Sequence, residues 1–531
     1  MVPSLTDRLR RASSPSLGLG IALGFFFSIA GCEAESPPSR SLSTLQPAPT
    51  EPLAVPEPQL VILISIDTLR ADHLGLYGHH RFTSPTLDLF ALEGTVFEDA
   101  SSVAPWTLPA HASMLTGLYP LGHAVVNADT KLPEGVPTIA KLLGENGWET
   151  AAAVNSAWLL RKTHEVTRDF DHFLFVQEAV AARLPTAAIT DQAIAWIRDS
   201  QDSNLFVFMH YYDVHSDYTS LPRFEKLMVS DYEGEADGTS WQLNVASMPD
   251  AFIESCHRVF EEEKCSFGSG ETTRIVDSSV RKRKFEPEDI RHLEELYDAG
   301  IRQLDTELGR FFELLRAENL LDSTRIIITS DHGEEFSDHG SFYHVETPYQ
   351  EILHVPLIFR GPGIAAGRRI QAPVSLVDLA PTILAWAGVN APSEIDGFDL
   401  SPLLSQAQPE PGTEDLIDRL NTRFQHGEAT NSSQWELKVP GLVPVLSSIR
   451  RGPLKLVHRS LDDEVALFDL SLDPNETTDI APQNPGITQS LREAMESRKA
   501  KFAGEPSQQN QVELDPVDAE RLRALGYLID E

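Results

Sequence analysis

The stretch that decides the fold runs from Leu60 to Asp67 and reads LVILISID. It is apolar except for Ser65 and the final Asp67 and shows no polar alternation, which is typical of a parallel strand buried on both faces. The run ends abruptly at an acid. Because open α/β sheets place their ligands beyond the carboxyl ends of the strands, Asp67 becomes a candidate site residue.

Further apolar runs repeat this pattern, and helical stretches separate them. The expected strands are 150–154, 205–209, 326–329 and 355–359. The expected helices include 136–146, 187–198 and 287–317. This alternation predicts an α/β sandwich with a mostly parallel central sheet.

The pattern changes after about residue 400, where a small α+β subdomain with an antiparallel sheet is expected. Residues 405–435 are polar and predict loops. Short strands are expected at 443–449, 454–458 and 465–470, followed by a helix near 489–501.

Two later strands also end in residues that can carry chemistry. The run 326–330 leads into Asp331-His332, and the run 206–209 leads to His210, Asp213 and His215. Taken singly, each is most simply a turn residue or a helix cap. Carboxylates and imidazoles at one end of one sheet can instead converge on a divalent cation.

The segment 104–117, APWTLPAHASMLTG, predicts the start of a helix with Thr107 near the N-cap and Pro109 in the first turn. A hydroxyl there faces unpaired backbone amides and the positive end of the helix dipole. That position suits an alkoxide or a bound anion. The simpler interpretation is that Thr107 only caps the helix.

The charge composition restricts the kinds of binding partner expected for this 531-residue chain, which carries a formal net charge of −36. So negative a protein repels nucleic acid and anionic membrane surfaces, and we expect no nucleic-acid partner. An anionic substrate is still compatible, because a metal ion and histidines can make one site locally positive.

The N-terminus predicts export. Basic residues at 8–11 precede an apolar stretch, 17–30, that is too short to span a membrane comfortably, and Gly31-Cys32 follow. Residues 1–32 look like a bacterial lipoprotein signal, with Cys32 lipidated and anchoring the protein in the cell envelope, in the periplasm or at the outer surface. An ordinary cleaved signal or an uncleaved anchor is the alternative.

The domain organisation follows from composition. Residues 33–57 are rich in Pro, Ser and Glu and predict a flexible tether. We expect a catalytic domain over 58–404 with an insertion at about 216–285, a C-terminal subdomain over 405–500 and a tail over 501–531. Cys256 and Cys265 lie in the insertion, and a local disulfide is expected for an exported protein.

Three motifs together resemble the sulfatase family of the alkaline phosphatase superfamily. They are ISIDTLRADHLG at 64–75, TLPAH followed by LTG at 107–117, and TSDHGEE at 329–335. The resemblance implies an alkaline-phosphatase-like α/β fold and an ester hydrolase. It also implies one divalent metal ion, which Ca, Mg, Mn or Zn could supply.

The resemblance also implies roles for individual residues. Metal ligands are expected at Asp67, Asp331 and His332, with Thr68 in the place of a further ligand. Thr107 matches the nucleophile, which also touches the metal. His215 matches a substrate-contacting histidine, and His344 falls where relatives place a residue near the leaving group.

Three departures from the family pattern concern chemistry. Thr107 replaces the Cys or Ser that sulfatases oxidise to formylglycine, so no formylglycine is expected. His111, a further catalytic candidate, replaces the signature arginine. Val154-Asn155 replaces a Gly-Lys pair that contacts substrate.

We therefore expect an exported, metal-dependent hydrolase that cleaves a sulfate or phosphate ester through a covalent Thr107 intermediate. The threonine favours phosphoester chemistry, and the expected substrate is an anionic small molecule or a glycan or lipid ester. The alternatives are an envelope phosphotransferase of the same superfamily and a degenerate sulfatase-like protein that binds glycans.

Overall fold

The computed structural model of the chain describes residues 60–176, 185–247, 265–267, 274–276, 284–405, 412–428, 446–460, 462–502 and 511–512. The expected signal with Cys32, the tether and Cys256 lie outside these residues. Among the residues described, no helix has the length and apolar character needed to cross a membrane.

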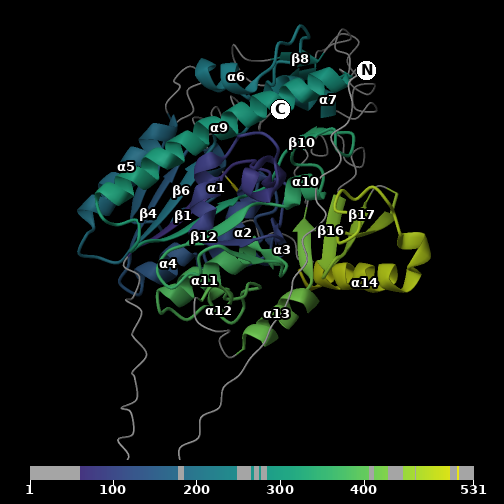
Figure 1. Cartoon of the computed structure of the whole chain (residues 1–531). Helices are drawn as coiled ribbons and strands as arrows, with labels where there is room; N and C mark the ends of the chain where they lie inside the picture. The colour runs from purple at the N-terminus through teal and green to yellow at the C-terminus, as the bar shows by residue number, and fades with distance from the viewer. Residues whose placement is uncertain are drawn as a thin grey trace, which may run out of the picture. The chain divides into compact units, whose positions relative to one another are not determined.

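An eight-stranded sheet forms the centre of the protein, in the order β13-β2-β12-β9-β1-β6-β4-β5 (Figure 1). Its strands are β1 (Leu60–Ile66), β2 (Thr95–Phe97), β4 (Glu149–Val154), β5 (His172–Phe175), β6 (Leu205–Tyr211), β9 (Arg325–Ser330), β12 (Leu357–Arg360) and β13 (Arg368–Ile370). Every ladder is parallel except the two that β12 makes with β9 and β2. The predicted α/β sandwich with a mostly parallel sheet is confirmed.

Strand β1 lies inside this sheet, between β6 and β9, and all seven of its residues are buried. Its side chains divide between two cores. Val61 and Leu63 pack into the core on one face, and Ile62 and Ile64 pack into the core on the other. This explains the apolar run without alternation, because neither face of the strand meets water.

Helices cover both faces of the sheet (Figure 1). One face carries α1 (Pro85–Leu92), α5 (Pro185–Asp199) and the long α9 (Pro287–Ala317); the other carries α2 (Thr107–Thr116), α4 (Ile139–Gly144) and α11 (Leu379–Trp386). Parallel strands need such crossover helices, so the layers follow from the strand order.

The C-terminal part forms a four-stranded antiparallel sheet, as expected. It contains β15 (Gln425–Glu428), β16 (Leu446–Arg451), β17 (Leu454–Arg459) and β18 (Glu464–Asp469), and α14 (Pro485–Lys501) packs on it. The buried carboxylate of Glu476 links this sheet to Gln350, which lies in the connection between β9 and β12 of the larger sheet. Lys455 Nζ lies 2.8 Å from Glu476 Oε1, and Glu476 Oε2 accepts the Gln350 N–H at 2.7 Å.

Two expectations were wrong in detail. The region 405–435, expected as loops, contains α13 (Thr413–Thr422) and β15. Helix α13 buries Leu416 and Leu420, four residues apart on one face of a short amphipathic helix, whereas β15 has no large apolar residue. The strand expected at 355–359 runs antiparallel as β12, because a connection without a long helix favours an antiparallel return.

The described part of the predicted insertion forms α6 (Pro222–Met228), α7 (Ser240–Ser247) and the antiparallel pair β7 (Cys265–Phe267) and β8 (Arg274–Val276). Phe224 and Met228 of α6 pack against Ala299 of α9. The remaining short elements are η1 (Ala71–His73), η2 (Gly75–Tyr77), β3 (Ala100–Ser101), α3 (Pro120–His123), η3 (Ala157–Leu159), β10 (Glu335–Phe336), β11 (Phe342–Tyr343), α10 (Gln350–Leu353), β14 (Val374–Ser375), η5 (Leu376–Asp378), α12 (Ser401–Leu404) and η6 (Ala481–Gln483).

Candidate active site

Strand order brings the predicted metal ligands together. Asp67 follows β1 and Asp331 follows the adjacent β9, so both carboxylates lie at the same edge of the sheet. His332 Nε2 lies 3.7 Å from Asp67 Oδ1 and 3.4 Å from Asp331 Oδ2. All three side chains are fully buried.

The electrostatics of this group call for a cation. Burial raises the pKa of Asp67, against the opposing charges of His215 and His332. Burial and the charge of Asp67 raise the pKa of Asp331. Asp67 Oδ1 and Asp331 Oδ2 have no hydrogen-bond partner among the residues described. Two orphaned carboxylate oxygens beside an imidazole fit a divalent ion, which would compensate their burial.

Thr107 adjoins these ligands. It is the first residue of α2, and Trp106 occupies the N-cap position without a side-chain cap bond. The Thr107 hydroxyl does not cap the helix; it lies 3.5 Å from Asp67 Oδ2 and 3.5 Å from His332 Nε2. The interpretation of Thr107 as a mere cap is wrong, and the helix dipole favours negative charge at its position.

Thr68 shapes the loop after β1. Its φ of 56° is left-handed, which is strained for a β-branched residue and is found where surrounding structure enforces it. The backbone N–H of Thr68 lies 3.3 Å from Asp331 Oδ1, and the Tyr297 hydroxyl donates to its carbonyl at 2.7 Å. Thr68 thereby orients Asp331, and direct metal ligation by its hydroxyl stays a prediction.

His111 lies behind the nucleophile, away from solvent. Its Nδ1 is 2.8 Å from the Thr107 carbonyl oxygen, so Nδ1–H donates, and Nε2 accepts from the Ser65 hydroxyl at 2.9 Å. Burial lowers the pKa of His111 to about 3, so the ring is neutral. His111, expected to be catalytic, is therefore a positioning residue that holds the first turn of α2 against β1.

His215 and His344 pack beside the metal-ligand group. Their ring centroids lie 4.8 Å apart, and the ring centroid of His344 lies 4.6 Å from that of His332. Burial lowers the pKa of His215 to about 4, and burial with the nearby His332 and His215 lowers the pKa of His344 well below its usual value. Both predicted histidines reach the site.

The loop that carries His344 is held against the nucleophile's helix. The Val345 N–H donates to the Pro105 carbonyl at 2.8 Å, two residues before Thr107. Glu334 Oε1 lies 2.9 Å from His344 Nδ1 and orients the ring. Sequence reasoning missed Glu334, although it follows Asp331-His332 within the same motif.

Gly333 cannot carry a side chain in the turn after these ligands. A Cβ on Gly333 would lie 1.9 Å from the Glu351 carbonyl oxygen. The Gly333 N–H donates to the Ile352 carbonyl at 2.7 Å. The close approach fixes the turn that presents Asp331-His332.

Asp213, expected at the same edge, does not join the site. It accepts from the Thr186 hydroxyl and, at 3.4 Å, from the Gln303 amide. It therefore ties the end of β6 to α5 and α9. His210, in contrast, points back to the centre, with Nε2 at 3.2 Å from Asp67 Oδ2.

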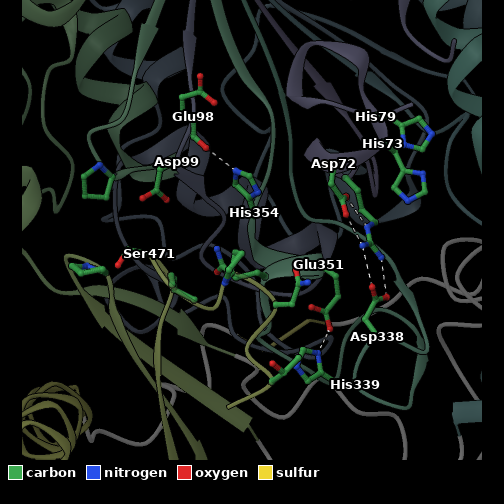
Figure 2. A pocket seen from close by; sticks show the side chains of 18 of the residues that line it. Asp72, His73, His79, Glu98, Asp99, Asp338, His339, Glu351, His354 and Ser471 are labelled. Carbon is green, nitrogen blue, oxygen red and sulfur yellow. Dashed lines mark hydrogen bonds and ion pairs between the residues drawn. The ribbon is translucent and has the colours of Figure 1, made fainter. Parts of the chain in front are cut away.

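A cavity of about 1060 Å³ lies elsewhere, between the loop after β1 and the C-terminal sheet (Figure 2). Its walls carry charges of both signs with carboxylates in excess, and several are paired: Arg70 binds Asp72 and Asp338, and His339 binds Glu351. None of the predicted metal ligands lines it. The predicted nucleophile, Thr107, lies instead beside the predicted metal ligands, outside this cavity.

A second cluster, His73, His79 and Asp298, could also offer three metal-ligand atoms. Arg81 already occupies it, with Nη1 at 2.7 Å from Asp298 Oδ2. The pKa of Asp298 is lowered to about 2, because bonds from His73 and His79 outweigh its burial. This cluster is an ion-pair network that holds the 73–81 loop on α9.

Comparison with known proteins agrees with this geometry. Residues 59–389 match the family model described as Sulfatase, and residues 337–501 match the model described as N-sulphoglucosamine sulphohydrolase, C-terminal. The chain therefore belongs to the sulfatase family, and it is an ester hydrolase.

Similar sequences include proteins named as sulfatases, and similar solved structures share the fold. Arylsulfatase K of Rattus norvegicus is 28% identical over 86% of this chain and 81% of its own length. N-acetylglucosamine-6-O-sulfatase of Bacteroides thetaiotaomicron is 24% identical over 79% of this chain and 82% of its own. The phosphonate monoester hydrolase of Agrobacterium radiobacter superposes with a TM-score of 0.64 at 20% identity, covering 86% of this chain and 100% of its own. The last likeness shows the fold.

Replacing His111 tests its positioning role. We expect His111→Phe, which keeps a ring but removes both nitrogen bonds, to lower the free energy of unfolding by about 1–3 kcal/mol. We also expect kcat to fall at least about tenfold with KM nearly unchanged, because the nucleophile is misplaced while substrate contacts remain. Urea unfolding and steady-state kinetics measure the two effects. Wild-type kcat in this variant would contradict the role.

Proposed function

We propose that this sulfatase-family enzyme hydrolyses a phosphoester, a phosphodiester or phosphonate monoester above all, through a covalent Thr107 intermediate. One observation carries the proposal. The Thr107 hydroxyl sits at the N-terminus of α2, 3.5 Å from both Asp67 Oδ2 and His332 Nε2. A hydroxyl so placed is an activated nucleophile rather than a structural group.

The identity of the nucleophile favours phosphorus over sulfur. Sulfatases clear sulfate when a formylglycine hydrate collapses to its aldehyde, without attack at sulfur. A threonine ester has no such exit, so water must attack the central atom directly. The fold is shared with phosphonate monoester hydrolases as well as with sulfatases, so it is compatible with attack at either phosphorus or sulfur.

Asp67, Asp331, His332 and Thr107 would hold the divalent cation on which the family's enzymes depend. When bound, the ion lowers the pKa of the Thr107 hydroxyl and offsets charge on the ester oxygens.

The chain's own residues then divide the reaction. The Thr107 oxygen forms a bond to phosphorus as the bond to the leaving oxygen breaks, while the neutral His344 takes the Thr107 proton and passes it to the leaving oxygen. His344 is the better placed of the two histidines, since Glu334 orients its ring and its Nε2 has no hydrogen-bond partner in the described chain. Water then attacks phosphorus and gives a proton to His344, and the Thr107 oxygen leaves and takes that proton.

We propose an anionic ester of a sugar or lipid as the substrate. The sugar sulfatase among the relatives supports a carbohydrate ester, although the replacement of a substrate-contacting lysine by Asn155 leaves less positive charge for a multiply charged group. Export and anchoring through Cys32 belong to the same proposal and are supported by the basic and apolar N-terminal pattern.

Substrate preference and the role of Thr107 can be measured together. With Mg, Ca, Mn or Zn added, we expect turnover of bis-nitrophenyl phosphate and nitrophenyl phenylphosphonate to exceed that of nitrophenyl sulfate. Thr107→Ala should lower kcat by at least about 1,000-fold, because it removes the nucleophile, and Thr107→Ser should retain substantial activity.

Other outcomes point elsewhere. Sulfate turnover that survives Thr107→Ala contradicts the threonine mechanism. Transfer to an added alcohol in preference to water indicates a phosphotransferase. Glycan binding without any turnover indicates a degenerate binding protein.

The leaving group reports on His344. We expect His344→Gln to reduce kcat far more for a phenyl or alkyl ester than for the matching nitrophenyl ester, since a poor leaving oxygen needs a proton and a good one does not. Glu334→Gln should show the same pattern more weakly. Equal losses for both esters would show that His344 only positions substrate.

A further inference from the structure

His210 belongs to the site, although no family role was assigned to it. It lies in β6 opposite Ser65 of β1, and its side chain is fully buried. Asn155 Oδ1 lies 3.2 Å from its Nδ1. An amide oxygen only accepts, so Nδ1 carries the proton and Nε2 presents a lone pair.

That lone pair faces negative groups. His210 Nε2 lies 3.2 Å from Asp67 Oδ2, yet the two atoms form no hydrogen bond, and Nε2 has no other partner in the part of the chain described. A lone pair beside a carboxylate is repulsive unless a cation lies between them. Asp331 Oδ2 also has no hydrogen-bond partner among the residues described, and Asp331 belongs to the same candidate ligand group as His210.

The spacing is that of ligands sharing one ion. Donor atoms about 2.1 Å from a metal, at right or tetrahedral angles, lie about 3.0–3.4 Å apart and do not point at one another. The contacts of Asp67 Oδ2 with His210 Nε2 at 3.2 Å and of Asp331 Oδ2 with His332 Nε2 at 3.4 Å both fall in this range.

His111 lies close enough to His210 and Asp331 to form a candidate ligand group with them, but both of its ring nitrogens already form hydrogen bonds. Its Nδ1 donates to the Thr107 carbonyl and its Nε2 accepts from Ser65, at 2.8 and 2.9 Å. Of the two histidines in this candidate group, only His210 therefore has an available nitrogen.

We propose that His210 Nε2 is a ligand of the catalytic ion, and that the ion is a transition metal of the zinc or manganese type rather than calcium. The proposal rests on the metal centre of the proposed function. Its donors would be two imidazole nitrogens, His210 and His332, the carboxylates of Asp67 and Asp331, and the Thr107 oxygen. Calcium prefers all-oxygen sites, whereas zinc and manganese accept mixed nitrogen and oxygen donors.

Metal binding tests this without any substrate. Equilibrium dialysis of the full chain should show Zn²⁺ and Mn²⁺ bound more tightly than Ca²⁺. His210→Gln should weaken Zn²⁺ binding on the order of 100-fold and change Ca²⁺ binding little. The matched control is His426→Gln, which alters a buried histidine of β15 outside the site and should leave all three affinities unchanged.

X-ray absorption of the zinc-loaded wild-type protein gives a second readout that needs no variant. We expect two imidazole ligands in the zinc spectrum and one in His210→Gln. Tighter binding of calcium, a single imidazole in the wild type, or unchanged zinc affinity in His210→Gln would each overturn the proposal. A failure of ester turnover would count only against the proposed function, since neither experiment uses an ester.

Discussion

The constraint on which the site depends is the burial of two carboxylates side by side. Asp67 and Asp331 end neighbouring parallel strands, are fully buried, and each leaves an oxygen without a partner in the described chain. Desolvation and mutual repulsion make this arrangement costly in an empty protein. The fold supplies the rigidity that keeps the pair together, and the divalent ion that we propose at this site would compensate their charge.

The helix that carries Thr107 is held by contacts of His111, which stands where the signature that the sequence resembles has an arginine, and of the loop that carries His344. His111 joins the Thr107 carbonyl to Ser65 of β1 through two hydrogen bonds, and Val345 holds the His344 loop to Pro105. Substituting a neutral imidazole for a guanidinium removes one positive charge from the centre. A further imidazole, His210, faces Asp67 from β6.

Much of the fold followed from the sequence, because apolar runs without alternation mark strands buried on both faces. The run at Leu60 and the helix beginning at Pro287 were predicted within a residue of their ends. Strand β15 could not be predicted, since its residues are all polar and are buried by tertiary contacts that have no local signal. The direction of β12 likewise depends on its neighbours in the sheet.

The site was predictable where a motif placed a residue at a strand end, as for Asp67 and Asp331-His332. It was not predictable where geometry decides a role. His111 proved to lie behind Thr107, Asp213 turned toward α5 and α9, and Glu334 became visible only through its contact with His344. The periodicity and spacing of residues in a sequence do not show which way a side chain points or which group it contacts.

The central claim is that the Thr107 oxygen becomes covalently bonded to the substrate's phosphorus. Acid quenching during turnover of a phosphoester, followed by peptide mass spectrometry, tests it most directly. The account predicts a phosphoryl or phosphonyl adduct on the peptide containing Thr107, formed within one turnover and absent from Thr107→Ala. Turnover in which no adduct forms on Thr107, or an adduct on a different residue, would contradict it.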